Sequence, residues 1–171
     1  MPGEYLFLKP PAVQGANGEN FIMAGMIGFM ATWTTYGTWL QGDKRGYVKN
    51  GITLDANAHL EKSNEELLKH DKIRIPKSLR KTVENAILKE AEENNQKVYA
   101  IAICSNHVHI IVESTDERCG YSVGRFKRAA TKALREYGFA DKVWTKGFDK
   151  RYCYNQHELE TRIKYVQSHK T

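Results

Sequence analysis

The chain has 171 residues, of which 41% are apolar and 27% charged, a composition typical of one soluble domain with a sizeable core. Its three cysteines show no C-x-x-C spacing, which argues against a disulfide framework or a cysteine zinc site and indicates a reducing, cytoplasmic environment. The apolar run at 21–33 is too short to cross a bilayer and lacks a basic leader, so neither a membrane partner nor a secretory signal is expected.

The net charge of +6 is concentrated in the last third of the chain. From residue 121 to the end, 12 Lys or Arg residues stand against 5 Asp or Glu residues. A basic surface of this kind attracts polyanions, most often nucleic acid. A basic surface without a partner would explain the charge equally well.

The first part of the chain predicts a leader, a strand and a long connection. Residues 1–25, with few apolar side chains, predict a flexible leader, and residues 26–171 predict a single domain. Aromatic and β-branched residues at 26–39 favour a strand. The polar stretch at 52–75 predicts an irregular connection with a short helix at 63–70.

The remainder predicts alternating helices and strands. The order β-α-β-β-α-β-α is typical of a ferredoxin-like α+β fold, with two helices on one face of a four-stranded antiparallel sheet. The last helix directly follows the fourth strand, so we expect it to cross the other face. The expected elements are a helix at 76–95, a strand at 97–104, a strand starting at His107, a helix at 122–137, a strand at 150–155 and a helix at 156–170.

Two histidines lie one residue apart in the third predicted strand. Because successive side chains of a strand point to opposite faces, His107 and His109 share one face, and Val108 and Ile110 take the other. Two adjacent imidazoles could hold a metal ion, act as an acid and base pair, or be solvated.

The final helix supplies further chemistry. Its apolar stripe leaves Tyr165 and His169 together on one flank, as i, i+4 neighbours. A helix across the open face would therefore bring these two side chains to His107 and His109. Imidazoles can hold a divalent ion that polarises a phosphodiester, and a tyrosine hydroxyl can attack the phosphorus.

A resemblance to a known family rests on four segments: SNHVHIIV, IKYVQSH, TWTTYGTWLQGDKRG and VWTKGFDKRY. The first resembles the His-hydrophobe-His (HUH) motif of the single-tyrosine transposases, both insertion-sequence and REP-associated, and the second is similar to their catalytic tyrosine segment. The third resembles the first strand and loop of one bacterial branch, and the fourth the segment before the tyrosine helix. The resemblance covers about residues 30–170.

The resemblance implies a transposase or endonuclease that cuts and rejoins single-stranded, hairpin-bearing DNA through a 5′-phosphotyrosine intermediate. Matched position by position, His107 and His109 are metal ligands and Tyr165 is the nucleophile, with Mg²⁺ or Mn²⁺ as the cofactor. His169 occupies the position, often Gln or Asn, that completes the metal site, and because three histidines also hold zinc the preferred ion stays open. A bacterial, nucleoid-associated protein is also implied, with a homodimer as one option.

Residues for DNA contact are proposed on two elements. Trp33, Tyr36 and Trp39 follow one another at intervals of three; at least one should be core, and an exposed one near a basic groove could stack an unpaired base. The helix at 122–137 is the candidate for phosphate contacts, through Arg125, Lys127, Arg128 and Lys132.

Two other functions stay open. A non-catalytic ferredoxin-like nucleic-acid-binding module explains the charge and aromatics, but gives no reason for Tyr165 and His169 beside the histidine pair. A histidine-based phosphoesterase would usually carry two H-x-T/S motifs, and this chain has one H-x-H and no second copy. Within the leading hypothesis, Tyr152 and Tyr154 are rival nucleophiles.

Overall fold

The computed structural model describes residues 25–49 and 52–170 of the chain. The leader predicted at 1–25 lies outside these residues apart from Gly25. No helix in the described part of the chain is long and apolar enough to span a bilayer. In chain order, the elements are β1 (Gly28–Thr34), β2 (Tyr47–Lys49), β3 (Ile52–Leu54), α2 (Ala58–Glu66), α3 (Lys77–Glu93), β4 (Val98–Ile103), β5 (His107–Glu113), α4 (Cys119–Arg135), β6 (Asp149–Cys153) and α5 (Gln156–Gln167).

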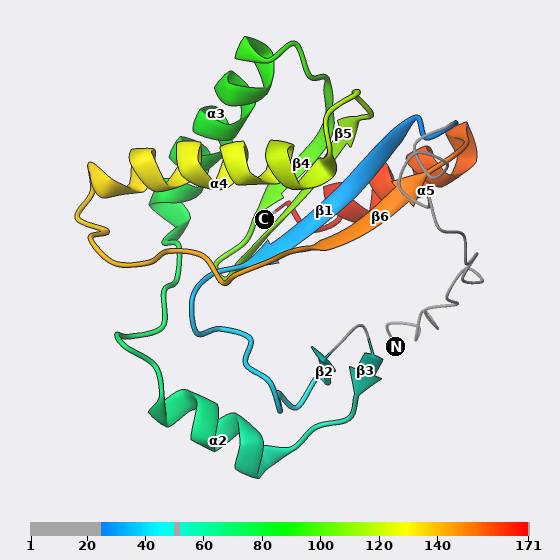
Figure 1. Ribbon diagram of the computed structural model, residues 1–171. Coiled ribbons are helices and arrows are strands. Elements are labelled where there is room, and N and C mark those ends of the chain that lie inside the picture. Colours follow the sequence, from blue (N-terminus) through cyan, green and yellow to red (C-terminus); the bar gives the residue numbers. More distant parts are fainter. Residues whose placement is uncertain (1–24, 50–51, 171) are drawn as a thin grey trace.

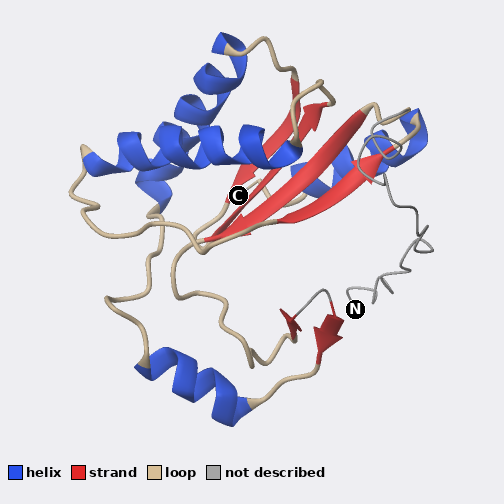
Figure 2. Ribbon diagram, viewed as in Figure 1, coloured by secondary structure: helices blue, strands red, loops and turns tan. Residues whose placement is uncertain are grey.

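The main sheet has four antiparallel strands in the order β4-β5-β1-β6. Helices α3 and α4 pack against each other on one face, and α5 lies across the other, where it contacts all four strands (Figures 1 and 2). The strands therefore follow the ferredoxin-like order, in which the first and third strands are central. The predicted α+β fold is confirmed.

Apolar residues fill both faces of this sheet. The larger core joins the sheet to α3 and α4, whose apolar stripes supply Val83, Ile87, Val123 and Phe126. The smaller core lies under α5 and is made of Met30, Ala100, Ala102, Ile111, Cys153, Leu159 and Val166. Burial of its own apolar stripe in this smaller core holds α5 on the sheet.

The region between β1 and α3 differs from the prediction. The first strand ends at Thr34, well before residue 39, and Gly37 follows it with a φ of +74°, which interrupts extended backbone. The stretch expected to be irregular contains the β2–β3 hairpin and α2, below the main sheet in Figure 1. The helix begins earlier than predicted because the Asn57 side chain caps its first turn.

Candidate functional site

The two histidines of β5 lie on the sheet face that α5 covers. On the opposite face, Val108 and Ile110 belong to the core under α3 and α4, whereas Ile111 belongs to the core under α5. His107 and His109 share the parity of Ile111. His109 is buried, with 6% of its surface exposed, and His107 is half-buried.

Helix α5 carries the other two side chains of the site. Asn155 caps its first turn by accepting a backbone hydrogen bond at 2.9 Å, and Leu159 and Val166 anchor it in the smaller core. These anchors fix the rotation of the helix. Tyr165 lies half-exposed on the histidine side, and His169 follows in the turn after the helix.

Four aromatic rings consequently meet at one place, the His–Tyr cluster, made of His107, His109, Tyr165 and His169. The rings of His107 and His109 have centroids 4.6 Å apart. His169 lies 4.8 Å from His109 and 6.3 Å from His107. The Tyr165 ring lies 5.4 Å from His109 and 4.5 Å from His169. The structure thus brings together the four side chains that the sequence placed together.

Backbone and amide oxygens fix the protonation of two of these rings. Nδ1 of His107 lies 2.8 Å from Oδ1 of Asn106, and Nδ1 of His169 lies 2.8 Å from the backbone oxygen of Tyr165. Since both oxygens only accept hydrogen bonds, each Nδ1 must donate. In a neutral imidazole the lone pair then resides on Nε2, the form in which histidine binds a metal ion.

The local environment also favours neutral rings on β5. Burial lowers the pKa of His109 to about 3, with smaller contributions from the neighbouring charges of His107 and His169. Burial likewise lowers the pKa of His107, helped by His169 and Arg45. Both β5 imidazoles are therefore uncharged at neutral pH and offer lone pairs to a cation or proton donor.

The hydroxyl of Tyr165 holds its proton more tightly than a free tyrosine. Partial burial raises its pKa, with a smaller contribution from the nearby Cys104. A tyrosine in this environment becomes a good nucleophile only when a positive charge or a base favours loss of the proton as the new bond forms.

The donor set of the cluster fits a divalent ion by chemistry. Imidazoles sharing one ion have centroids roughly 5 Å apart, because the metal–nitrogen bonds are about 2 Å long, and the three rings are spaced close to this. Within residues 25–49 and 52–170, however, no three His, Cys, Asp or Glu side chains are already arranged as a metal site. The three imidazoles are thus close enough to share one ion, but the rings would have to turn before their nitrogens pointed at it.

Three supporting residues were not recognised as part of the site from the sequence. The Thr32 hydroxyl lies 2.7 Å from Nδ1 of His109, Asn106 orients the other β5 histidine, and the Cys104 thiol donates to the backbone oxygen of His169 at 3.8 Å. Thr32 could have been suspected as a polar residue within an apolar strand. Its pairing with His109 needs the register of β1 against β5, which the sequence does not state.

The basic residues proposed for DNA contact lie elsewhere. Helix α4 packs on the face opposite α5, so the structure does not bring its basic side chains to the cluster. Arg128 and Lys132 are exposed to solvent. The other two, Arg125 and Lys127, are partly buried.

Both partly buried residues have protein partners. Arg125 forms ion pairs with Glu90 and Glu117. Lys127 donates through Nζ to two backbone carbonyls of the segment before β6, at 3.0 and 2.6 Å. Burial lowers the pKa of Lys127 to about 8.

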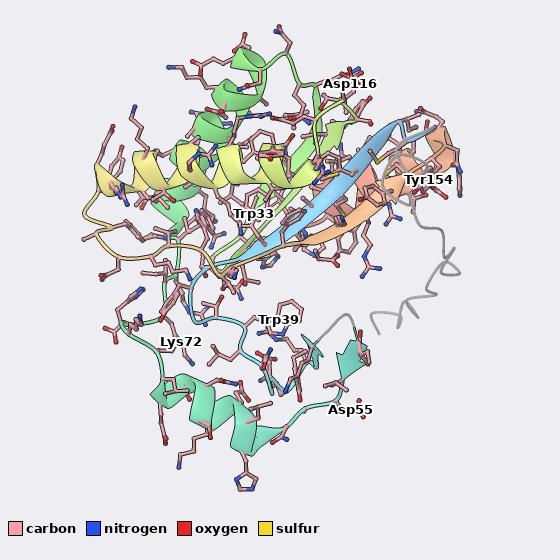
Figure 3. The ribbon with its side chains drawn as sticks, in the orientation of Figure 1. Trp33, Trp39, Asp55, Lys72, Asp116 and Tyr154 are labelled. Atoms are coloured by element: carbon pink, nitrogen blue, oxygen red, sulfur yellow. The ribbon has the colours of Figure 1, made fainter. Side chains whose placement is uncertain are left out.

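The rival tyrosines are outside the cluster. Tyr152 packs against the larger core, on the α3–α4 face. Tyr154 is exposed beyond the end of β6, as labelled in Figure 3, with its ring centroid 6.2 Å from that of Tyr152.

The chain is similar to known proteins in sequence and in fold. The family model described as "Transposase IS200 like" matches residues 67–169, more than half of the chain and all four residues of the His–Tyr cluster. A solved structure described as a REP-associated tyrosine transposase bound to a REP hairpin has a TM-score of 0.52 at 11% identity, over 82% of this chain and 64% of that one. The chain thus spans less than two thirds of that protein's length.

A second solved structure, a candidate transposase from Deinococcus radiodurans R1, has a TM-score of 0.45 at 10% identity, over 85% of this chain and 92% of that one. No curated protein matches the chain.

Proposed function

The chain belongs to the family of IS200-like transposases, and from this premise we propose that it cuts and rejoins single-stranded, hairpin-bearing DNA through a 5′-phosphotyrosine intermediate. The observation that carries the proposal is the contact of the Tyr165 ring with His109 and His169. Tyr165 is 46% exposed, so a phosphodiester can reach a side chain that already lies against the imidazoles. A surface tyrosine placed for solubility would have no reason to lie there.

The proposed reaction is a transesterification. The Tyr165 oxygen attacks phosphorus, the bond from phosphorus to the 3′ oxygen breaks, and the tyrosine is left joined to the 5′ phosphate. The tyrosine proton leaves as the new bond forms, and the departing 3′ oxygen takes up a proton. No electrons are transferred, and a 3′ hydroxyl can reverse the step, which rejoins the strands.

We assign metal binding to His107, His109 and His169, with Mg²⁺ or Mn²⁺ as the ion. A bound divalent ion would polarise the scissile phosphate and favour loss of the tyrosine proton. The chain's own contribution is to keep the β5 imidazoles neutral by burial and to fix the Nδ1 protons of two rings with oxygen acceptors.

Hairpin DNA is the proposed partner, supported by the solved relative, which is described as bound to a REP hairpin. The phosphates of a hairpin stem would lie on α4, where the exposed Arg128 and Lys132 would contact them, whereas Arg125 and Lys127 are already engaged by protein partners. The reaction would take place on DNA in the bacterial cytoplasm. All cluster side chains come from one chain, so a homodimer is a separate proposal, tested by the mass of the protein in solution.

A substitution of Tyr165 tests the proposed function. Tyr165→Phe keeps the ring and its packing and removes the nucleophilic oxygen, so this variant should bind hairpin DNA normally and form no covalent adduct. The wild type should link protein to 3′-labelled DNA on a denaturing gel, because the 5′ phosphate of that fragment carries the tyrosine. With a 5′ label, the released fragment should run free of protein.

Tyr154→Phe is the matched control, since Tyr154 has the same 46% exposure and lies outside the cluster. It should retain the adduct, as should Tyr152→Phe. A wild type that cuts without any protease-sensitive adduct is a nuclease that uses water, and one that only binds is a binding module. Either result overturns the proposal.

A further inference from the structure

The loop between β1 and β2 is attached to the His–Tyr cluster through Asn106. The hydroxyls of Thr35 and Thr38 both donate to the backbone oxygen of Asn106, at 3.2 and 3.3 Å. The backbone NH of Thr35 donates to the same oxygen at 2.8 Å. Because the Asn106 side chain also accepts from His107, one residue connects this loop to the cluster.

Within that loop, Arg45 is held in a defined orientation. Its Nε and Nη2 donate to the two carboxylate oxygens of Asp43 at 2.7 and 2.6 Å, and Nη2 also donates to the backbone oxygen of Thr38 at 3.0 Å. Asp43 is buried, whereas the Arg45 side chain is 47% exposed. These bonds use the Nε hydrogen and both Nη2 hydrogens, which leaves both Nη1 hydrogens without a partner among the described residues.

An exposed aromatic ring completes the arrangement. The guanidinium carbon of Arg45 lies 4.9 Å from the centroid of the Trp39 ring. Trp39 Nε1 donates to the backbone oxygen of Gly46 at 2.9 Å, which fixes the indole, yet 41% of Trp39 remains exposed. Figure 3 shows Trp39 on the segment that leaves β1, on the side of the β2–β3 hairpin.

Hydrogen bonds join Arg45 to the cluster. Its Nη2 donates to the backbone oxygen of Thr38, whose hydroxyl lies 3.3 Å from the backbone oxygen of Asn106, the residue that orients His107. The basic residues of α4 are separated from the cluster by the sheet. Arg45 is therefore a fixed cation tied to the end of β5 that carries His107.

We propose that Trp39 and Arg45 hold the single-stranded DNA that flanks the scissile phosphate, with Nη1 of Arg45 donating to a phosphate oxygen and the Trp39 ring stacking on an unpaired base. This inference rests on the proposed function and names the part of the substrate that the loop binds. A guanidinium pre-oriented by a buried carboxylate suits phosphate binding, since little side-chain freedom is lost on contact. Base stacking on an exposed indole is largely independent of sequence.

The test compares two DNA probes bound by proteins that cannot cut. One probe is a hairpin with a short single-stranded flank, and the other is the same hairpin without it. All proteins carry Tyr165→Phe, so binding is measured without reaction. The variant Asp43→Asn with Arg45→Gln keeps the net charge and leaves no buried carboxylate unpaired, and Trp39→Leu removes the stacking surface.

Both variants should bind the flanked hairpin roughly tenfold more weakly and the flankless hairpin as tightly as the parent. The Asn/Gln variant should also lower the salt slope of log K for the flanked probe by about 0.7, the value for one single-strand phosphate contact. Trp39→Phe, which retains an aromatic face, should recover most of the lost affinity. Equal affinity for the flanked probe, or equal weakening on both probes, overturns the inference.

The outcome is separable from that of the proposed function. An adduct in the wild type together with unchanged flank binding in the loop variants refutes this inference alone. Flank binding that depends on Trp39 and Arg45, in a protein that forms no adduct, supports the DNA contact and refutes the chemistry.

Discussion

The hydroxyl of Thr32 lies 2.7 Å from Nδ1 of His109, its direct partner across the β1–β5 ladder. This hydrogen bond fixes the orientation of the most buried ring in the His–Tyr cluster. A hydrogen bond to the second ring nitrogen orients a metal-binding histidine, and its removal typically costs 10–100-fold in metal affinity or activity.

Thr32→Val, which keeps the shape of the side chain, should therefore reduce nicking of hairpin DNA by roughly tenfold or more and raise the metal concentration needed for half-maximal rate. Thr32→Ser retains the hydroxyl and should cut near the wild-type rate. Thermal unfolding monitors the fold of both. If the Val variant cuts like the wild type at limiting metal, the Thr32 hydroxyl has no role in orienting the ring.

The assignment of His107 and His109 as metal ligands makes a stronger prediction. Replacing either by alanine removes an imidazole from the proposed ion site, so nicking should collapse while the circular dichroism spectrum is retained. His59→Ala is the control, because His59 is exposed on α2, outside the cluster, and its loss should change nothing. A His107→Ala variant that cuts at the wild-type rate with the same metal would show that the ligand assignment is wrong.

The cluster could be predicted from sequence because its geometry is local. Strand alternation places His107 and His109 on one face, and helical spacing joins Tyr165 to His169. The contact between the last helix and the histidine strand is long-range in sequence, and burial of the apolar stripe of that helix determines it. Trp33 is a core residue, as expected for at least one aromatic of its segment, whereas Trp39 is exposed.

Features that depend on register or on side-chain direction could not be predicted. The pairing of Thr32 with His109 requires knowing which residues of β1 and β5 lie opposite one another. Lys127 belongs to a basic helix by sequence, yet its ammonium group turns to backbone carbonyls of a distant segment. The β2–β3 hairpin was missed because each strand has only three residues, too few for a periodic signal.

The surface of α4 should control the salt dependence of DNA binding. Replacing Arg128 and Lys132 by alanine removes two exposed cations, so the slope of log K against log salt should fall by up to about 0.9 for each lost contact with a hairpin stem. Lys62→Ala, an exposed lysine of α2, is the control for a charge lost elsewhere. An unchanged slope in the double variant would place the stem on another surface.

Lys127 should contribute to stability in a pH-dependent way. Its pKa in the folded protein is lowered to about 8 by burial, from an ordinary value of 10.5. Between these values the unfolded chain binds one more proton than the folded chain, so the free energy of unfolding rises with pH across this window. Lys127→Met cannot titrate, so the free energy of unfolding of the wild type minus that of the variant should increase from pH 8 to pH 10.5 in urea unfolding. A constant difference would mean that Lys127 is not desolvated.

Docking of α5 should govern the position of the nucleophile. Val166 is fully buried in the smaller core and is the residue next to Tyr165. Val166→Ala should lower the free energy of unfolding by about 2 kcal/mol and loosen the last turn of α5, so adduct formation should fall more than hairpin binding does.

Val123→Ala is the matched control, because Val123 is equally buried but lies in the larger core under α4. The Val123→Ala variant should lose a similar free energy of unfolding and leave the ratio of adduct to bound DNA unchanged. Equal losses of adduct in both variants, measured well below their melting temperatures, would show that general stability and not the seating of α5 places Tyr165 against the histidines.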